Sequence, residues 1–120
     1  MRSRAEAAEE ELEKRLAELE RELELFVKRG VRPAARQGES FIIAYALRLL
    51  GAKAGLGVKR GRYRIRLPYV ERKKALERIE RVNVREAVAK AYRLYALWGR
   101  FLRARGVTLL EYFYSLCGAL

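Results

Sequence analysis

The chain has 120 residues, enough for a single domain with a modest hydrophobic core. Its 27 lysines and arginines outnumber its 15 acids, all of them glutamate, and it has no aspartate and no histidine, for a formal net charge of +12. This composition excludes a Ser/His/Asp or Cys/His relay, an aspartate dyad and an imidazole metal site. We expect no enzymatic activity, no metal or other cofactor, and a polyanionic partner.

Cysteine usage and apolar runs indicate the compartment. Cys117 is the only cysteine and cannot form an intramolecular disulfide, so we expect a reducing cytoplasm. The longest apolar run, residues 41–47, is far shorter than the roughly 20 residues that cross a bilayer, and no signal peptide is visible. We therefore expect a cytoplasmic protein without membrane contact. The scarcity of Asn, Gln, Cys and Met beside abundant Arg and Glu favours a thermophilic source.

Charge is distributed unevenly along the chain. Residues 1–30 hold 7 basic and 9 acidic groups, a net −2, whereas residues 31–120 hold 20 basic and 6 acidic groups, a net +14. We expect one helical domain over residues 1–120, in which residues 31–120 form a basic core that carries the partner-facing surface.

The first predicted element is a long helix that ends before Gly30. Ser3 and Glu6 form a capping box. A narrow apolar seam then recurs at steps of four and three residues, at Leu12, Leu16, Leu19, Leu23 and Phe26. About 26 residues at 1.5 Å rise span about 39 Å, so the helix is expected to overhang a bundle of shorter helices. It is either a bundle helix or an arm whose 12–26 seam forms a coiled coil with another chain.

A central helix is predicted next. Pro33 suits the first turn of a helix, and residues 41–50 are apolar except for Arg48, before Gly51 ends the element. A helix that is apolar on nearly all sides must lie in the centre of the bundle.

The following segment, at about 52–67, has a different residue composition. After four glycines, Arg62, Arg64 and Arg66 alternate with Tyr63, Ile65 and Leu67. A period of two predicts a short strand or hairpin, or an extended basic loop. The glycines do not fit a Walker loop, because Leu56 stands where the second glycine belongs, and they miss the dinucleotide fingerprint by one position. We interpret them as turn residues.

Cations dominate this segment. Between residues 53 and 66 there are six and no acid, namely Lys53, Lys59, Arg60, Arg62, Arg64 and Arg66. On extended backbone the last three share one face at steps of about 6.6 to 7 Å, close to the phosphate spacing of a nucleic-acid strand. Arginine can bind a phosphate in bidentate fashion and stack on a base. The segment is a solvated charge run or a polyanion site, and the lack of acids favours the site.

Three further helices complete the prediction. Residues 69–82 have a helical pattern, Asn83 with Glu86 caps a helix that continues to Gly106, and Thr108 with Glu111 opens a short apolar helix. The terminal segment 109–120 is either buried in the bundle or covered by a second subunit. The predicted fold class is all-α, a bundle of four to five helices with a long first helix and a basic loop or hairpin.

Helix faces extend the basic surface. The cations concerned are Arg72 and Lys73 on the 69–82 helix and Lys90, Arg93, Arg100 and Arg103 on the next helix. Each row alone is more typical of a solvated face, but with the basic segment they can line one groove that contacts the nucleic-acid backbone without reading sequence. Tyr63 and Tyr69 are the candidates for base stacking, whereas the aromatics of residues 92–101 are expected to pack in the core. Glu39 and Glu111 are the only acids in apolar or basic contexts and so the only candidates for acid–base chemistry. Capping already explains Glu111.

Three pieces of the chain resemble the small all-helical subunits of type III CRISPR effector complexes. They are the long first helix that leads through a proline-containing turn into the apolar helix 41–50 and Ala-Lys-Ala at 52–54, the Ala-Tyr-Arg-Leu-Tyr of 91–95, and the Trp-Gly-Arg-Phe-Leu of 98–102. The resemblance implies a non-catalytic subunit that stacks along a guide RNA and its target strand through basic helix faces.

Two alternatives remain open. The chain also resembles the small, basic, helical capsid proteins of filamentous archaeal viruses, which wrap DNA with an N-terminal arm, although the acidic first helix argues against such an arm touching DNA. The second alternative is a helical protein-interaction or oligomerisation module, which the 12–26 seam and the 109–120 segment would hold together. We favour a sequence-indifferent nucleic-acid-binding subunit of a larger assembly.

Overall fold

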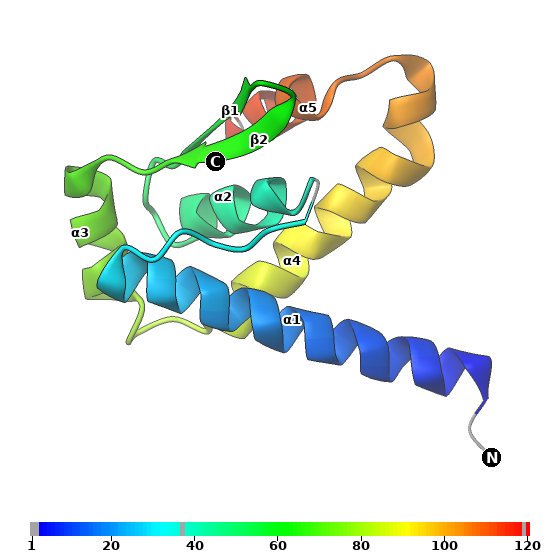
Figure 1. Cartoon of the computed structure of the whole chain (residues 1–120), viewed down its shortest axis with the longest axis horizontal. Helices are drawn as coiled ribbons and strands as arrows, with labels where there is room; N and C mark the ends of the chain where they lie inside the picture. Colours follow the sequence, from blue (N-terminus) through cyan, green and yellow to red (C-terminus); the bar gives the residue numbers. More distant parts are fainter. Residues whose placement is uncertain (1–2, 37, 119) are drawn as a thin grey trace.

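The computed structural model describes residues 3–36, 38–118 and 120 and shows a helical protein with one two-stranded sheet (Figure 1). The helices are α1 (Arg4–Arg29), α2 (Glu39–Leu49), α3 (Tyr69–Arg78), α4 (Val84–Leu97) and α5 (Leu109–Cys117), and the strands are β1 (Gly55–Lys59) and β2 (Arg62–Arg66). This confirms the predicted all-α bundle with a long first helix and a basic hairpin. None of the described helices combines the length and the apolarity that a membrane span requires.

Helix α1 is capped as predicted and overhangs the rest of the molecule. The Glu6 amide donates to the Ser3 hydroxyl at 3.1 Å, and Gly30 ends the helix with a φ of 67°. Residues 4–14 are exposed and project beyond the other elements (Figure 1). From Leu16 to Phe26, however, the seam packs into the chain's own core. The predicted contact seam for another chain is therefore wrong over this stretch, because the same chain covers it.

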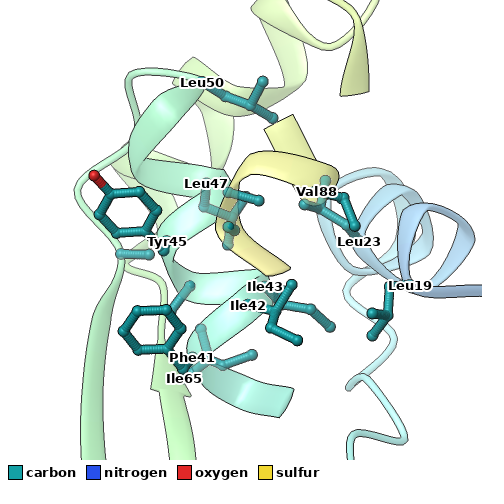
Figure 2. Close-up of a cluster of buried hydrophobic side chains, with 14 of the residues drawn as sticks. Leu19, Leu23, Phe41, Ile42, Ile43, Tyr45, Leu47, Leu50, Ile65 and Val88 are labelled. Atoms are coloured by element: carbon teal, nitrogen blue, oxygen red, sulfur yellow. The ribbon is translucent and has the colours of Figure 1, made fainter. Parts of the chain in front are cut away.

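Helix α2 is the centre of the fold. Every residue from Ser40 to Leu47 is buried, and the helix contacts α4, α5 and both strands. Figure 2 shows Leu23 and Val88 on one side of α2 and Ile65 of the hairpin on the other. The prediction for Pro33 is wrong, because this residue lies in a segment without regular secondary structure and α2 begins only at Glu39.

The later helices follow their predicted caps but differ in length and pitch. Helix α3 ends at Arg78, four residues before the predicted end. The Asn83 side chain caps α4 by accepting from the Glu86 amide at 3.0 Å. The predicted 83–106 helix does reach Gly106, but as α4, a π-helix (Trp98–Leu102) and a 3-10 turn (Arg103–Arg105).

Helix α5 belongs largely to the core. The Glu111 amide donates to the Thr108 hydroxyl at 3.1 Å, which confirms the predicted cap. Leu109, Tyr112 and Phe113 are buried, and Tyr112 donates from its hydroxyl to the Leu94 carbonyl at 2.8 Å. Of the two predicted fates for residues 109–120, burial in the bundle holds for this part of the segment, and position 119 lies outside the described residues.

Candidate nucleic-acid interface

The predicted basic segment is an amphipathic β-hairpin. In its antiparallel register Leu56 pairs with Ile65, and both side chains are buried against the core. The alternate residues point the other way, so Arg62, Arg64 and Arg66 of β2 lie on the outer face, opposite Lys59, Gly57 and Gly55 of β1. All three arginines are exposed, as the period of two predicted.

The tip of the hairpin holds Arg60 in a conformation that arginine rarely adopts. Lys59 pairs with Arg62, so Arg60 and Gly61 form a two-residue turn with φ values of 53° and 76°. Both central residues of a type I′ turn need positive φ, which Asn-Gly supplies most readily. Arg60 is the only described residue other than glycine with positive φ. A cation is therefore held at the tip at a local conformational cost.

Residues distant in sequence hold both edges of the hairpin. At the β1 edge, the Tyr114 hydroxyl accepts from the Leu56 amide at 3.1 Å and donates to the Leu56 carbonyl at 2.9 Å. At the β2 edge, Arg32 donates to the Ile65 carbonyl at 3.1 Å. An isolated two-stranded hairpin is marginally stable, and an open edge can pair with another chain. These contacts therefore fix the hairpin and present its outer face on a rigid support.

The outer face carries positive charge without internal neutralisation. A shallow depression of about 230 Å³ on this face is lined by Arg32, Lys59, Arg64 and Arg66, among others. Glycine at position 57 leaves room for the Arg66 guanidinium, which would lie 3.4 Å from an added Cβ. In the part of the chain that the structure describes, no ion pair joins a cation of residues 59–66 to a glutamate.

Other predicted phosphate ligands have different surroundings. Arg72 is half-buried, and its Nε donates to the Val27 carbonyl at 2.8 Å, so it caps the end of α1 instead of extending a groove. Lys53 lies beside Glu71, which accepts hydrogen bonds from the Lys53 amide and from Lys74. These bonds lower the pKa of Glu71. We therefore remove Arg72 from the candidate interface, because its guanidinium is occupied. The Lys53 side chain is exposed and has no ion pair among the described residues, so its role stays a prediction.

Lys73 and Tyr69 form a separate exposed pair on α3. The Lys73 ammonium lies 6.0 Å from the centre of the Tyr69 ring, which is 69% exposed. Tyr69 begins α3 three residues after Arg66, whereas Tyr63 is half-buried within β2.

The predicted row on the fourth helix is broken by the π-helix. Arg93 and Arg100 are exposed, and the Arg103 guanidinium lies over the Trp98 ring, 5.8 Å from its centre. A π turn holds more residues per turn than an α turn and so rotates the residues after it. Arg103 thereby joins Trp98 at the rim of a cleft.

That cleft lies between the hairpin and the end of α4. It consists of two adjoining depressions of about 410 and 420 Å³ that share Gly38 and Tyr63. One extends to Arg36, Gly61 and Arg62, and the other extends to Tyr95, Trp98 and Arg103. The sequence pattern gives no signal for Arg36, and it predicts that Tyr95 and Trp98 pack in the core. Both are half-buried and pack against the core, as their helical spacing predicts, and the exposed part of each lines the cleft.

Glu39 begins α2 directly after Gly38 of the cleft, and its charge is balanced inside the protein. Its carboxylate accepts hydrogen bonds from the Arg15 side chain and, at 2.9 Å, from the Arg36 amide. Burial acts to raise the pKa of Glu39, but these bonds outweigh it and leave the pKa below its ordinary value. Glu22 differs, since burial raises its pKa and its buried Oε2 has no hydrogen-bond partner among the described residues.

Comparisons with known proteins match the chain to no protein-family model, no curated protein and no solved structure. Within the described residues, no group of three or more His, Cys, Asp or Glu side chains is arranged to hold a metal ion. The chemistry of the surface itself therefore carries the functional argument.

Proposed function

We propose that the protein is a non-catalytic nucleic-acid-binding subunit that holds the phosphate backbone on the outer face of the β1–β2 hairpin, without reading sequence. One observation carries this proposal. Lys59, Arg60, Arg62, Arg64 and Arg66 lie on one fixed hairpin with no glutamate partner among the described residues. Phosphates supply the counter-charge that the chain itself does not supply there.

The binding mode follows from the side chains present. The hairpin offers guanidinium and ammonium groups at regular steps, and such groups recognise phosphate oxygens in any sequence. Strong dependence of affinity on salt is the expected signature, because each bound phosphate releases counterions. The single cysteine is consistent with work in the cytoplasm.

The overhanging part of α1 supports a place in a larger assembly. Residues 4–14 bear five glutamates, they are exposed, and they project beyond the other elements, although Glu13 pairs with Arg85 of α4. The alternative of a pure oligomerisation module has less support, because Leu16, Leu19, Leu23 and the buried face of α5 are already occupied by the chain's own core.

A charge-matched pair of variants tests the proposal. Replacing Arg60, Arg62, Arg64 and Arg66 by alanine removes four hairpin cations. Replacing Arg4, Arg21, Arg81 and Arg105, all exposed and outside the hairpin, lowers the net charge equally. Fluorescence anisotropy with a fifteen-nucleotide oligouridylate is measured over a range of salt concentrations.

The hairpin variant should bind on the order of 100-fold more weakly at low salt and lose about 3 from the slope of log K against log salt. The control variant should keep most of its affinity and most of its salt slope. Equal losses in the two variants would show that only total charge matters, and the hairpin assignment would then be wrong.

A further inference from the structure

The cleft beside the hairpin has aromatic walls and cationic ends. Tyr63, Tyr95 and Trp98 line it and are each half-buried, so part of each side chain faces the open space. The two depressions, of about 410 and 420 Å³, have the size of ligand pockets, which are typically about 300 to 1,000 Å³.

The aromatic walls are held in place. Trp98 donates from its indole nitrogen to the Val107 carbonyl at 2.8 Å, and its ring meets the Tyr95 ring edge to face at 6.0 Å. Gly38 lets Tyr95 approach closely, because an added Cβ would lie 2.2 Å from the phenol oxygen. Rings that are fixed before binding lose little entropy when a planar ligand stacks on them.

The cations mark both ends of the cleft. Arg36 and Arg62 lie at the end of the cleft next to the hairpin. Arg103 lies at the other end, beside Trp98. The nearby Glu39 carboxylate is neutralised by Arg15 and the Arg36 amide, so it offers little repulsion to an anion. Arg62 also belongs to the outer face of the hairpin, so the cleft continues the surface proposed to bind phosphates.

We infer that this cleft receives an unpaired base of a single-stranded nucleic acid. The base stacks among Tyr63, Tyr95 and Trp98, and its flanking phosphates contact Arg62 and Arg103. Bases in a duplex are stacked on one another and do not reach such a cleft, so the protein prefers single strands. This inference rests on the proposed function, because the hairpin brings the strand to the cleft.

The first test uses the unmodified protein and its only tryptophan, Trp98. Binding of fifteen-nucleotide oligothymidylate should quench Trp98 emission and shield it from acrylamide. An oligomer of fifteen abasic sites keeps the phosphates but lacks bases, so it should bind about tenfold more weakly and leave the emission nearly unchanged. A fifteen-base-pair duplex should also leave it unchanged. Equal affinity for the base-containing and abasic strands would overturn the inference.

Variants locate the effect. Tyr63→Leu removes a ring and should cut the tenfold preference for bases to about threefold or less, whereas Tyr63→Phe keeps the ring and the preference. Arg103→Gln should weaken binding of oligothymidylate and reduce the quenching at saturation, whereas Arg105→Gln, an exposed neighbour outside the cleft, should not. If Tyr63→Leu fails to fold, the comparison with the abasic strand and the comparison of Arg103→Gln with Arg105→Gln still test the inference. A base preference unchanged by Tyr63→Leu, together with affinity and quenching unchanged by Arg103→Gln, would overturn the inference.

Failure of the inference and failure of the proposed function give different results. If the abasic strand binds as tightly as oligothymidylate and both lose affinity in the hairpin variant, the phosphate surface stands and the base site does not. If no nucleic acid binds with salt dependence, both proposals are wrong.

Discussion

The arginines of this protein fall into two groups that sequence composition does not separate. Those on the hairpin point away from the protein, whereas several of the helical body contact it. Arg15 binds Glu18 and Glu39, and Arg85 binds Glu13 and Glu20. Arg48, Arg72 and Arg78 donate to backbone carbonyl groups. A net charge of +12 therefore indicates a polyanion partner only where the cations are left without internal partners.

The two groups have different consequences for stability and binding. An arginine that satisfies a buried carbonyl or carboxylate stabilises the fold, and its loss leaves an unpaired polar group. An exposed arginine without a partner contributes little to the free energy of unfolding. The same substitution should therefore change stability in one group and nucleic-acid affinity in the other.

The largest expected effect on stability belongs to Arg48. Its Nε donates to the carbonyl of buried Ala54 at 2.6 Å, and its guanidinium lies 5.8 Å from the centre of the Phe113 ring. Arg48→Met keeps much of the side-chain volume but removes the donor, so the free energy of unfolding should fall by about 2 kcal/mol. Urea denaturation measures this loss. The salt dependence of nucleic-acid binding should stay unchanged, and a flattened slope would contradict the division into two groups.

A smaller effect with a defined pH dependence is expected at Glu39. Glu39→Gln should lower the free energy of unfolding at pH 7 by about 1.5 kcal/mol, because Arg15 loses one of its two charged partners. The folded-state pKa of Glu39 lies below its ordinary value, so the carboxylate stabilises the fold at neutral pH. This stabilisation is lost as the pH falls through the folded-state pKa. Denaturation from pH 7 to pH 2 should show the two proteins converging in acid.

Glu22 provides the control of opposite sign. Because burial raises its pKa, its charge is unfavourable in the folded state at neutral pH. Glu22→Gln should therefore raise the free energy of unfolding at pH 7, and the gain should disappear in acid, where Glu22 is protonated in both states. A loss of stability at pH 7 would show that an interaction of the charged group outweighs its burial.

The smallest stability change is expected at the hairpin tip, where one substitution should raise the stability of the fold and weaken nucleic-acid binding. Arg60→Asn places the residue that a type I′ turn prefers before Gly61, so the free energy of unfolding should rise by about 0.5 kcal/mol. The salt slope for a single strand should fall by about 0.7, since one cation is lost. Arg60→Lys retains the charge and should keep the slope. An Asn variant that gains stability without losing affinity would remove Arg60 from the interface.

Local patterns in the sequence predicted much of the fold. The caps at Ser3, Asn83 and Thr108 and the alternation of residues 62–67 each depend on neighbours a few residues apart, and the structure confirms them. The end of α3 and the start of α2 were placed wrongly, since no equally clear cap marks either.

The site was predicted less completely because it depends on contacts between distant residues. The helical pattern of the sequence predicts that Arg72 is exposed, yet its guanidinium donates to the carbonyl of Val27, 45 residues earlier. Arg32 and Tyr114, which hold the hairpin edges, lie 33 and 58 residues along the chain from the residues that they contact. The cleft additionally needs Gly38 and the π-helix at Trp98, neither of which has a sequence signature.

The division of the arginines can be observed directly by NMR of the Nε–Hε groups during titration with oligothymidylate. We predict that the signals of Arg60, Arg62, Arg64 and Arg66 shift with added strand and return as salt is raised. Those of Arg15, Arg48, Arg72 and Arg85 should stay in place, because their Nε–H groups or neighbouring guanidinium nitrogens already donate to the protein. Shifts spread evenly over both groups, or confined to the second, would contradict the account.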